Sequence, residues 1–435
     1  MQATTLSKVL TRSSWGGVGR PRALFVGTYP PRECGIATFT EDVRAAYDVS
    51  TGFSSDVIAI TDRERTYDYP PCVVSEIQRD HSGTYLAAAR FANDHPADVI
   101  NVQHEYGLFG GQLGLMLVDF LGQLRKPVTL TLHTTLPNPD EKMLYVTREL
   151  CNRSDSIIVL AETGRRLLEQ TYRIDPRKVR VVLHGAPDVP LRRSYRFKRL
   201  IGLENRTVIS TFGLLSRGKG IEYILDALPA IFAEHTDAEY LLLGQTHPEV
   251  LAQEGEAYRK SLRDRVDELG IGERVRFINH YMSDDEVVRW LLATDVYVSP
   301  SLDANQIVSG TLSYAVACGR AVVATRYLYA QEILADGRGI TVPFRDSAAL
   351  SKAVNSILED PELRSSIETS AYRFGRQMTW TRVAHEYEQG FLDAVHRRSG
   401  PALLARSEVH FAAKSLLQEA RGPAASLADM GLRRN

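Results

Sequence analysis

The chain has 435 residues, of which 44% are hydrophobic and 24% are charged, as in ordinary globular proteins. At roughly 100–200 residues per domain, this length predicts two to four domains. Lys and Arg number 52 against 53 Asp and Glu, so no overall field attracts nucleic acid or an anionic membrane.

The cysteines and the apolar runs indicate a cytoplasmic protein. Cys34, Cys72, Cys151 and Cys318 lie far apart and form no Cys-x-x-Cys pair, which excludes a cysteine zinc site and a disulfide framework. No apolar run approaches the roughly 18 residues of a membrane span. The basic, polar start of the chain lacks the apolar region of a secretory signal.

Short apolar runs rich in Val, Ile and Leu recur along the chain and predict strands. Between them lie helix-length segments with apolar residues spaced near 3.6, such as Ile221–Glu234 and Asp285–Ala293. Near-continuous apolar strands that alternate with helices indicate parallel sheets covered on both faces. The predicted strands are Ala23–Gly27, Val99–Gln103, Val128–Leu132, Ile157–Leu160 and Val179–Leu183, then Val208–Phe212, Tyr240–Leu243, Val275–Ile278, Val296–Ser299 and Ala321–Ala324. Because these strands exceed one comfortable sheet, we expect an α/β fold with two doubly wound, Rossmann-like domains.

The domain boundary should fall within Pro187–Arg206, where prolines and charges replace the alternation of strands and helices. This segment holds a basic cluster from Arg192 to Arg199, which we interpret as a solvated linker, with a phosphate or membrane-surface contact as the alternative. The predicted segments are a peripheral or disordered arm (1–21), a first domain (22–190), a linker (191–206), a second domain (207–379), a crossing helix (380–398) and a tail (399–435).

The segment Trp380–Val395 follows the last strand of the second half and has apolar residues at helical spacing. Two interpretations fit this periodicity equally well: a helix that crosses back to brace the first domain, and an ordinary core helix.

A polar loop, Gly27–Gly35, follows the first strand and leads into a helix. Ligands of doubly wound sheets bind beyond the carboxyl ends of strands, and the N-terminus of a helix favours anions. The spacing is not Gly-x-Gly-x-x-Gly, which disfavours a nicotinamide cofactor. A phosphate-binding loop that includes Gly35 and a simple structural turn remain equal alternatives.

Two strands of the first half end in histidine motifs, Gln103–Gly107 (QHEYG) and Leu132–Thr135 (LHTT). Neither has the His-x-x-x-His spacing of a zinc helix. A lone histidine is more often structural, but two at neighbouring strand ends favour a functional role. His104, Glu105 and His133 are therefore candidate site residues.

The stretch Phe212–Gly220 combines a strand end, glycines and the cations Arg217 and Lys219 at the entry to a helix. A departing diphosphate needs positive charge and backbone N–H groups at such a place. The order of a Walker A loop is absent. A solvated lysine is the alternative interpretation.

A loop after Ser299 leads into a helix that should start near Ser309 and end before Gly319. The start of this helix offers free backbone N–H groups, and side chains that bind hydroxyl groups lie close by in the sequence. The candidate residues here are Gln306, Ser309, Gly310, Thr311 and Tyr314.

The run Ser283-Asp-Asp-Glu286 suggests a metal site, but its spacing before an apolar run favours a capping box. No Asp-x-Asp motif occurs in the chain, so we expect neither a metal nor a metal-bridged diphosphate.

These stretches, in this order, resemble the family-4 retaining glycosyltransferases, which have the two-domain GT-B fold. The resemblance covers roughly Ala23 to Val395 and is strongest from Thr211 to Phe344. It implies an acceptor-binding N-terminal domain, a C-terminal domain that binds a nucleotide-diphospho-sugar, and a metal-independent reaction in the cleft between them.

The resemblance also assigns roles to individual residues. It implies that Gly35 faces the donor phosphates, that His133 contacts the donor sugar and that Lys219 neutralises the diphosphate. Gly213 and Leu215 match the other fixed positions of the family's Gly-Arg-Leu-x-x-x-Lys-Gly motif.

Two departures from the family pattern matter. The arginine of that motif is Leu214 here, with Arg217 as the candidate substitute. The family's Glu-x7-Glu pair, which contacts the transferred sugar and the nucleotide ribose, falls on Gln306 and Tyr314. An amide and a phenol can still bind hydroxyl groups, but negative charge beside a developing oxocarbenium ion is lost.

The sequence therefore predicts transfer of a hexose, with mannose as first choice, from a nucleotide-diphospho-sugar to a sugar or glycan acceptor with retention. His133 and Lys219 are the catalytic candidates, and His104 and Glu105 lie on the acceptor side. The first choice of donor is GDP-mannose and the second a UDP-hexose, with no other cofactor. No nucleic-acid partner is expected, while peripheral contact with the inner face of a membrane and the oligomeric state stay open.

Two other functions remain as alternatives. The missing glutamates suggest a non-catalytic GT-B protein that senses nucleotide sugars or assembles with an active transferase. A nucleotide-sugar hydrolase or epimerase would need a positioned acid and base, for which Glu105 and Glu332 are the nominated carboxylates.

Overall fold

The computed structural model describes residues 20–62, 66–191 and 195–399. The predicted N-terminal arm up to residue 19, the tail from residue 400, and Arg192 and Arg193 of the basic cluster lie outside the described residues.

The first domain is built on a seven-stranded parallel sheet of order β3-β2-β1-β4-β5-β6-β7. Its strands are β1 (Ala23–Gly27), β2 (Asp56–Thr61), β3 (Val73–Gln78), β4 (Val99–His104), β5 (Val128–Leu132), β6 (Ser156–Val159) and β7 (Val179–Val181). Its helices are α1 (Gly35–Thr51), α2 (Ser82–Asp94), α3 (Met116–Gln123), α4 (Glu141–Arg153) and α5 (Glu162–Gln170), with short 3₁₀ turns at Gln112–Gly114 and Pro176–Lys178.

The second domain is built on a six-stranded parallel sheet of order β10-β9-β8-β11-β12-β13. Its strands are β8 (Thr207–Phe212), β9 (Ala238–Leu243), β10 (Val275–Ile278), β11 (Val296–Ser299), β12 (Ala321–Thr325) and β13 (Ile340–Val342). Its helices are α6 (Tyr195–Leu200), α7 (Ile221–Glu234), α8 (Pro248–Glu254), α9 (Ala257–Glu268), α10 (Asp284–Ala293), α11 (Gly310–Ala317), α12 (Leu328–Ile333), α13 (Ser347–Glu359) and α14 (Pro361–Gly375), with 3₁₀ turns at Arg217–Lys219 and Gly272–Arg274.

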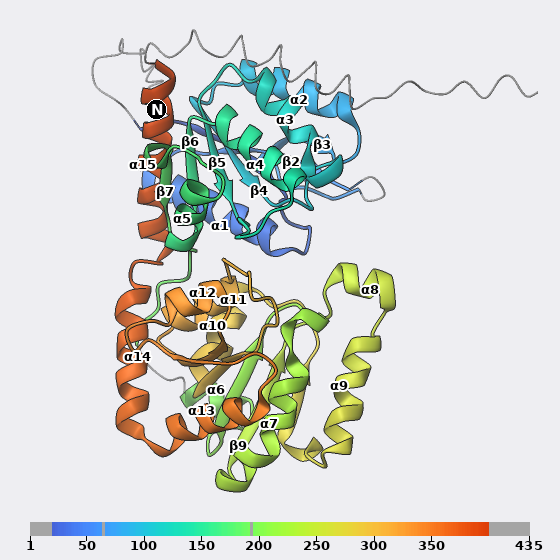
Figure 1. Ribbon diagram of the computed structural model, residues 1–435, viewed down its shortest axis with the longest axis vertical. Helices are drawn as coiled ribbons and strands as arrows, with labels where there is room; N and C mark the ends of the chain where they lie inside the picture. Colours follow the sequence, from blue (N-terminus) through green and yellow to red (C-terminus); the bar gives the residue numbers. More distant parts are fainter. Residues whose placement is uncertain (1–19, 63–65, 192–194, 400–435) are drawn as a thin grey trace, which may run out of the picture.

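The predicted fold class is confirmed: two Rossmann-like domains, each a parallel sheet between helices, lie one above the other (Figure 1). Alternate residues of a strand enter different cores because side chains of a strand point to opposite faces. Leu24 and Val26 of β1 join one buried apolar cluster, whereas Ala23 and Phe25 join another. Burial on both faces explains why the strands are nearly continuous apolar runs.

All ten predicted strands occur, with ends that differ by no more than one or two residues, but β2, β3 and β13 were missed. β3 and β13 are edge strands whose residues are mostly half-exposed, so their sequences carry little apolar signal. β2 is almost fully buried, and its apolar run was readable from the sequence.

The chain crosses between the domains twice, and the two crossings lie side by side. The backbone N–H of Ala186 donates to the carbonyl of Met378 (2.7 Å), and that of Trp380 donates to the carbonyl of Ala186 (3.2 Å). After the second crossing, α15 (Trp380–Ser399) runs along the first domain and packs on α1, β5 and β6 (Figure 1). This paired crossing joins the two domains.

Helix α6 lies within the segment predicted as a solvated linker, and it packs on the second domain. Lys198 is buried and pairs with Asp295 (2.6 Å), while the rings of Phe197 and Trp290 meet edge to face with 5.2 Å between centroids. For Lys198, interpretation as a solvated charge is therefore wrong, because the opposite charge of Asp295 lies beneath the helix. Arg196 and Arg199 are exposed.

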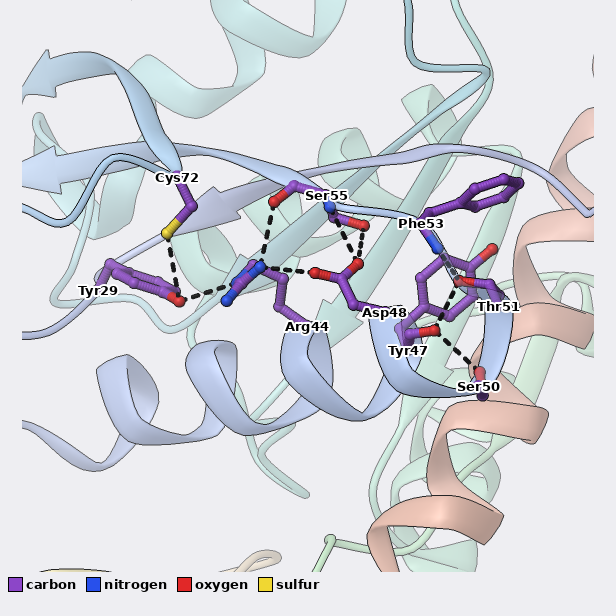
Figure 2. Close-up of polar contacts among 9 residues, drawn as sticks. All are labelled: Tyr29, Arg44, Tyr47, Asp48, Ser50, Thr51, Phe53, Ser55 and Cys72. Carbon is purple, nitrogen blue, oxygen red and sulfur yellow. Dashed lines mark hydrogen bonds and ion pairs between the residues drawn. The ribbon is translucent and has the colours of Figure 1, made fainter. Parts of the chain in front are cut away.

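Helix α1 is fixed to the first sheet by a polar network near its C-terminal half (Figure 2). Arg44 donates to the Tyr29 hydroxyl (2.8 Å) and to Asp48 (2.6 Å), and Asp48 accepts from both the backbone N–H (2.9 Å) and the hydroxyl (2.6 Å) of Ser55. Cys72 donates to the same Tyr29 hydroxyl (3.6 Å). Because Tyr29 lies in the loop before α1, the network holds both that loop and the helix whose N-terminus faces the other domain.

Candidate functional site

A cavity of about 590 Å³ lies between the two domains, where the carboxyl ends of both sheets face each other. This volume is within the usual range of ligand pockets. Of the residues predicted for the site, those that line it are Gly35, Glu105, His133, Gly213, Lys219, Gln306, Gly310, Thr311 and Tyr314. Ser309 borders a small adjoining void, while Arg217 and His104 line neither.

Lys219 is the cation of the second-domain wall. It lies in the 3₁₀ turn Arg217–Lys219 after β8, and burial lowers its pKa. Alternate residues of such a turn point in different directions. Arg217 therefore faces away from the cavity: its guanidinium pairs with Glu254 (2.7 Å) and lies over the ring of Tyr258. The expectation that Arg217 replaces the missing arginine at Leu214 is wrong.

Glycines shape the loop before Lys219. Gly213 has a φ of 138° and Gly244 has a φ of 123°, which side chains rarely allow. A Cβ on Gly244 would lie 2.3 Å from the carbonyl oxygen of Gly213. The two loops after β8 and β9 therefore touch through their backbones and leave backbone groups facing the cavity.

The N-terminus of α11 forms another part of the second-domain wall. Ser309 caps the helix by accepting from the N–H of Leu312 (3.3 Å), and Gly310 and Thr311 line the cavity in its first turn. Orphan N–H groups and the helix dipole favour an anion at this position. The Gln306 amide braces the preceding loop, because it accepts from Ser301 (2.9 Å) and donates to the carbonyl of Val308 (2.9 Å).

Tyr314 connects the second domain to the first. Its hydroxyl donates to Asp284 (3.0 Å), and Asp284 is hydrogen-bonded to Asp42 of α1. Burial and the neighbouring charge of Asp284 raise the pKa of Asp42 to about 8, and burial also raises the pKa of Asp284. Two carboxylates at hydrogen-bond distance share a proton, so this pair holds the domain interface only while it is protonated.

The first-domain wall opposes these elements with the N-terminus of α1. Cys34 occupies the cap position and accepts from the N–H of Ala37 (3.3 Å). Gly35 is the first helical residue, and a Cβ there would meet no protein atom within 4 Å. Two contacts join this end of the helix to the second domain: Thr38 with Tyr281 (2.8 Å) and Glu33 with Gln245 (2.6 Å).

His133 follows β5 and reaches the cavity beside α1. Its Nε2 lies 2.8 Å from Oε1 of Gln103, and Phe39 packs edge-on against its ring. Burial lowers the pKa of His133 to about 3, so the imidazole is neutral at physiological pH. A neutral imidazole beside the cavity can accept or donate a hydrogen bond but carries no charge.

His104 and Glu105, adjacent in sequence, have different surroundings. His104 is fully buried, stacks on Phe109 and meets the edge of Tyr106, so the prediction of an acceptor contact is wrong. As the last residue of β4, its side chain points to the core. Glu105 lines the cavity and accepts from the Thr134 hydroxyl (2.6 Å) and the backbone N–H of Tyr106 (2.9 Å), while burial raises its pKa.

Two interpretations of acidic residues need correction. Both oxygens of Glu332 accept backbone N–H groups at the start of α5, from Glu162 (2.7 Å) and Thr163 (2.8 Å). Glu332 therefore caps a helix of the other domain instead of serving as an acid or base. Ser283 precedes α10 as predicted, but its side chain makes no capping bond, and Glu286 pairs with His280 (2.6 Å).

Several residues that line the cavity are not among the predicted site residues. Asp42 lies in the second turn of α1. In the sequence it is marked only as a carboxylate that follows the loop Gly27–Gly35. Asp284 lies within the run Ser283–Glu286 that was predicted to be a capping box. His184 follows the predicted strand Val179–Leu183 by one residue, so the rule that flagged His104 and His133 would have found it. Burial lowers its pKa to about 4.

Within residues 20–62, 66–191 and 195–399, no group of three or more His, Cys, Asp or Glu side chains is arranged to hold a metal ion. No helix in this part of the chain has the length and apolar character needed to cross a bilayer.

Two family models match the chain one after the other. The model described as Glycosyltransferase Family 4 matches residues 43–189, and the model described as Glycosyl transferases group 1 matches residues 192–374. The junction between the matches coincides with the first crossing between the domains.

Curated relatives are distant. A D-inositol 3-phosphate glycosyltransferase of Corynebacterium kroppenstedtii is 26% identical over 70% of this chain and 69% of its own. A phosphatidyl-myo-inositol mannosyltransferase of Mycolicibacterium smegmatis is 30% identical over 42% of this chain and 43% of its own.

Solved structures share the fold. The structure of HepE of Anabaena, solved with UDP, matches 85% of this chain and 98% of the HepE chain, with a TM-score of 0.68 and 18% sequence identity. Sucrose-phosphate synthase of Thermosynechococcus elongatus gives the same coverage, identity and TM-score. The two family models match the two domains one after the other. The chain therefore belongs to the family-4 glycosyltransferases of GT-B fold.

Proposed function

We propose that the chain is a retaining hexosyltransferase that moves a hexose from a nucleoside diphosphate to a sugar or glycan acceptor without a metal. One observation carries the proposal: Lys219 and the N-termini of α1 and α11 line the same cavity from opposite domains. Each of these groups favours negative charge. Their convergence suits a diphosphate, whose charge increases as it leaves the sugar.

Lys219 would stabilise the departing diphosphate together with backbone N–H groups near Gly213, Gly310 and Thr311. Burial lowers the pKa of Lys219, and the negative charge of a phosphate beside it would raise that pKa again. Charge stabilisation in a site that excludes water is worth more than in solution. Domain closure about the paired crossing would exclude water from the donor.

In the proposed reaction, the bond between the anomeric carbon and the phosphate oxygen breaks while the acceptor oxygen bonds to that carbon from the same face. The acceptor's proton passes to the departing phosphate oxygen. This route needs no carboxylate nucleophile, so it is compatible with Gln306 and Tyr314 at the positions of the family's glutamates. It is also compatible with Asp42 and Asp284, which are engaged with each other.

GDP-mannose is the first candidate donor, because mannosyltransferases occur among the relatives. A UDP-hexose is the second, since HepE was solved with UDP and with UDP-glucose. The named relatives that act on inositol phosphates and phosphatidyl-inositol make a phosphorylated polyol a sensible first acceptor to test.

The proposal is tested by incubating the full chain with each sugar nucleotide and a panel of sugar, polyol phosphate and glycan acceptors. We expect nucleoside diphosphate release that depends on the acceptor, and a product whose anomeric configuration, read by NMR, equals that of the donor. Lys219→Ala should lower turnover about 10²–10³-fold, as loss of one charge stabiliser does.

Arg217→Ala is the matched control, because Arg217 lies two residues away on the same turn and faces outward. It should keep nearly full activity. Equal activity of Lys219→Ala and wild type would contradict the phosphate role of Lys219. Tight nucleotide binding without turnover across the panel would favour a sensor, and donor cleavage without acceptor would favour a hydrolase.

A further inference from the structure

A chain of buried hydrogen bonds leads through the first domain to His133. The Nδ2 of Asn101 lies 3.2 Å from the carbonyl oxygen of Thr129, and its Oδ1 lies 2.7 Å from Nε2 of Gln103. Oε1 of Gln103 in turn lies 2.8 Å from Nε2 of His133. Asn101 and Gln103 are fully buried, on the same face of β4.

The direction of every bond in this chain follows from its first member. A backbone carbonyl can only accept, so the Asn101 atom beside Thr129 must be the NH₂ group. Oδ1 of Asn101 is then the acceptor that Gln103 meets, which requires the NH₂ group of Gln103 there. The Gln103 atom beside His133 is consequently the carbonyl oxygen, which can only accept.

Nε2 of His133 must therefore carry a proton. Burial lowers the pKa of His133 to about 3, so the neutral ring has a single proton, and Nδ1 has a lone pair. Nδ1 has no hydrogen-bond partner among the residues that the structure describes, and His133 lines the cavity.

We propose that Asn101 and Gln103 are positioning residues that lock His133 in the Nε2–H tautomer and present the lone pair of Nδ1 to the cavity. The inference rests on the proposed function for the meaning of that lone pair. In a hexosyltransferase, Nδ1 would accept a hydrogen bond from a sugar hydroxyl. It would neither donate a proton to the substrate nor carry positive charge in the site.

The same network reaches the crossing helix. Thr131 of β5 lies 3.2 Å from Nδ2 of Asn101 and 3.1 Å from the hydroxyl of Tyr387 on α15. Thr131 supports the network without setting its direction, because its hydroxyl can donate or accept. The carbonyl of Thr129 alone fixes the orientation, which makes Thr131 a matched control in the same buried cluster.

The test is ¹⁵N NMR of the substrate-free full chain labelled at histidine, since the N–H nitrogen and the lone-pair nitrogen have well separated shifts. The His133 signals are assigned by their loss in His133→Gln. We expect a proton on Nε2 and a lone pair on Nδ1 between pH 6 and 8. A proton on Nδ1, an averaged pair of signals, or a protonated ring in this range would overturn the inference.

Variants separate positioning from packing. Gln103→Leu removes the acceptor and should give averaged tautomers, with kcat/KM for the donor lowered about tenfold, as for one lost hydrogen bond. Gln103→Glu, kept neutral by burial, can donate its O–H to Oδ1 of Asn101 and leave its carbonyl oxygen toward His133, so it should restore the Nε2–H signature. Thr131→Val should leave the tautomer unchanged. Loss of the signature in Thr131→Val, or its retention in Gln103→Leu, would assign the tautomer to something other than the amide chain.

The NMR result needs no turnover, so it is independent of the proposed function. If wild type shows the expected tautomer but transfers no sugar, the proposed function fails and the positioning stands. If wild type transfers sugar with another tautomer, the positioning fails alone.

Discussion

The two walls of the cavity are built by different means. The second-domain wall depends largely on backbone, from the glycine loops after β8 and β9, the turn that carries Lys219 and the first turn of α11, although Lys219, Gln306 and Tyr314 add side chains. The first-domain wall relies mainly on side chains: Glu105 is held by the Thr134 hydroxyl, and His133 is held by Gln103.

This difference explains what each wall demands of the sequence. A backbone wall needs particular residues at fixed spacing, because only glycine tolerates its torsion angles and close approaches. A wall made of side chains needs hydrogen-bond partners for its buried polar groups. These partners come from distant parts of the chain, so they leave no local sequence motif. We therefore expect the second-domain wall to be disrupted most by substitutions that add bulk. The first-domain wall should be disrupted most by substitutions that remove hydrogen-bond partners.

The largest effect should follow from adding a methyl group to the backbone wall. In Gly244→Ala, the new Cβ would meet the Gly213 carbonyl at 2.3 Å, on a backbone with φ of 123°. Strain and overpacking each cost about 1–3 kcal/mol, so we expect the free energy of unfolding, measured in urea, to fall by about 3 kcal/mol or more.

Gly270→Ala is the control for that substitution. Gly270 also has a positive φ, of 66°, but a Cβ there would meet nothing within 4 Å, so only strain remains. We expect a loss of about 1 kcal/mol. Equal losses in the two variants would show that the contact between the loops is unimportant.

A smaller effect should follow from cutting the contact between Glu332 and α5, which joins the domains. Glu332→Ala removes a charged cap from a helix N-terminus, a change worth about 1–2 kcal/mol. We expect a lower melting temperature and a larger radius of gyration by X-ray scattering, because the domains separate more readily. Glu359→Ala, at the exposed end of α13, should change neither. Unchanged scattering and melting in Glu332→Ala would contradict a role in closure.

A separate effect depends on pH and concerns Asp42. Its pKa of about 8 in the folded protein lies above the unfolded value of about 3.9, so folding takes up a proton between these values. Stability contributed by this group therefore declines as pH rises from about 4 to about 8. Asp42→Asn cannot ionise, so its stability relative to wild type should rise over that range and level off above it.

Thermal melting at several pH values measures this difference. The exposed Asp68→Asn serves as the control and should follow wild type at each pH. A constant offset between Asp42→Asn and wild type from pH 5 to 9 would show that Asp42 is already ionised at the domain interface.

Much of the fold and of the backbone wall could be predicted from the sequence. Strand ends followed from apolar runs, and Lys219, Gly213 and Gly310 followed from loops placed directly after strands. Arg217 could not be excluded in this way, because spacing alone does not tell which side of a turn a cation faces. That direction is set by Glu254 and Tyr258, which lie farther along the chain.

The side-chain wall was less accessible for the same reason. His104 and His133 end neighbouring strands, yet only His133 reaches the cavity, since the core beside Phe109 encloses His104. The Asp42–Asp284 pair joins residues of different domains, and the pairing of Glu332 with α5 does the same. Such contacts depend on how the domains meet, which no local pattern encodes.

The central claim, that the cavity binds a nucleoside diphosphate through Lys219 and helix N-termini, is tested most directly by calorimetry. GDP and UDP are titrated into wild type, Lys219→Ala and Arg217→Ala. We predict saturable binding of at least one nucleotide to wild type, unchanged affinity in Arg217→Ala, and affinity at least about tenfold weaker in Lys219→Ala, which corresponds to about 1.4 kcal/mol. Equal affinity in all three proteins, or no binding of either nucleotide to wild type, would contradict the claim.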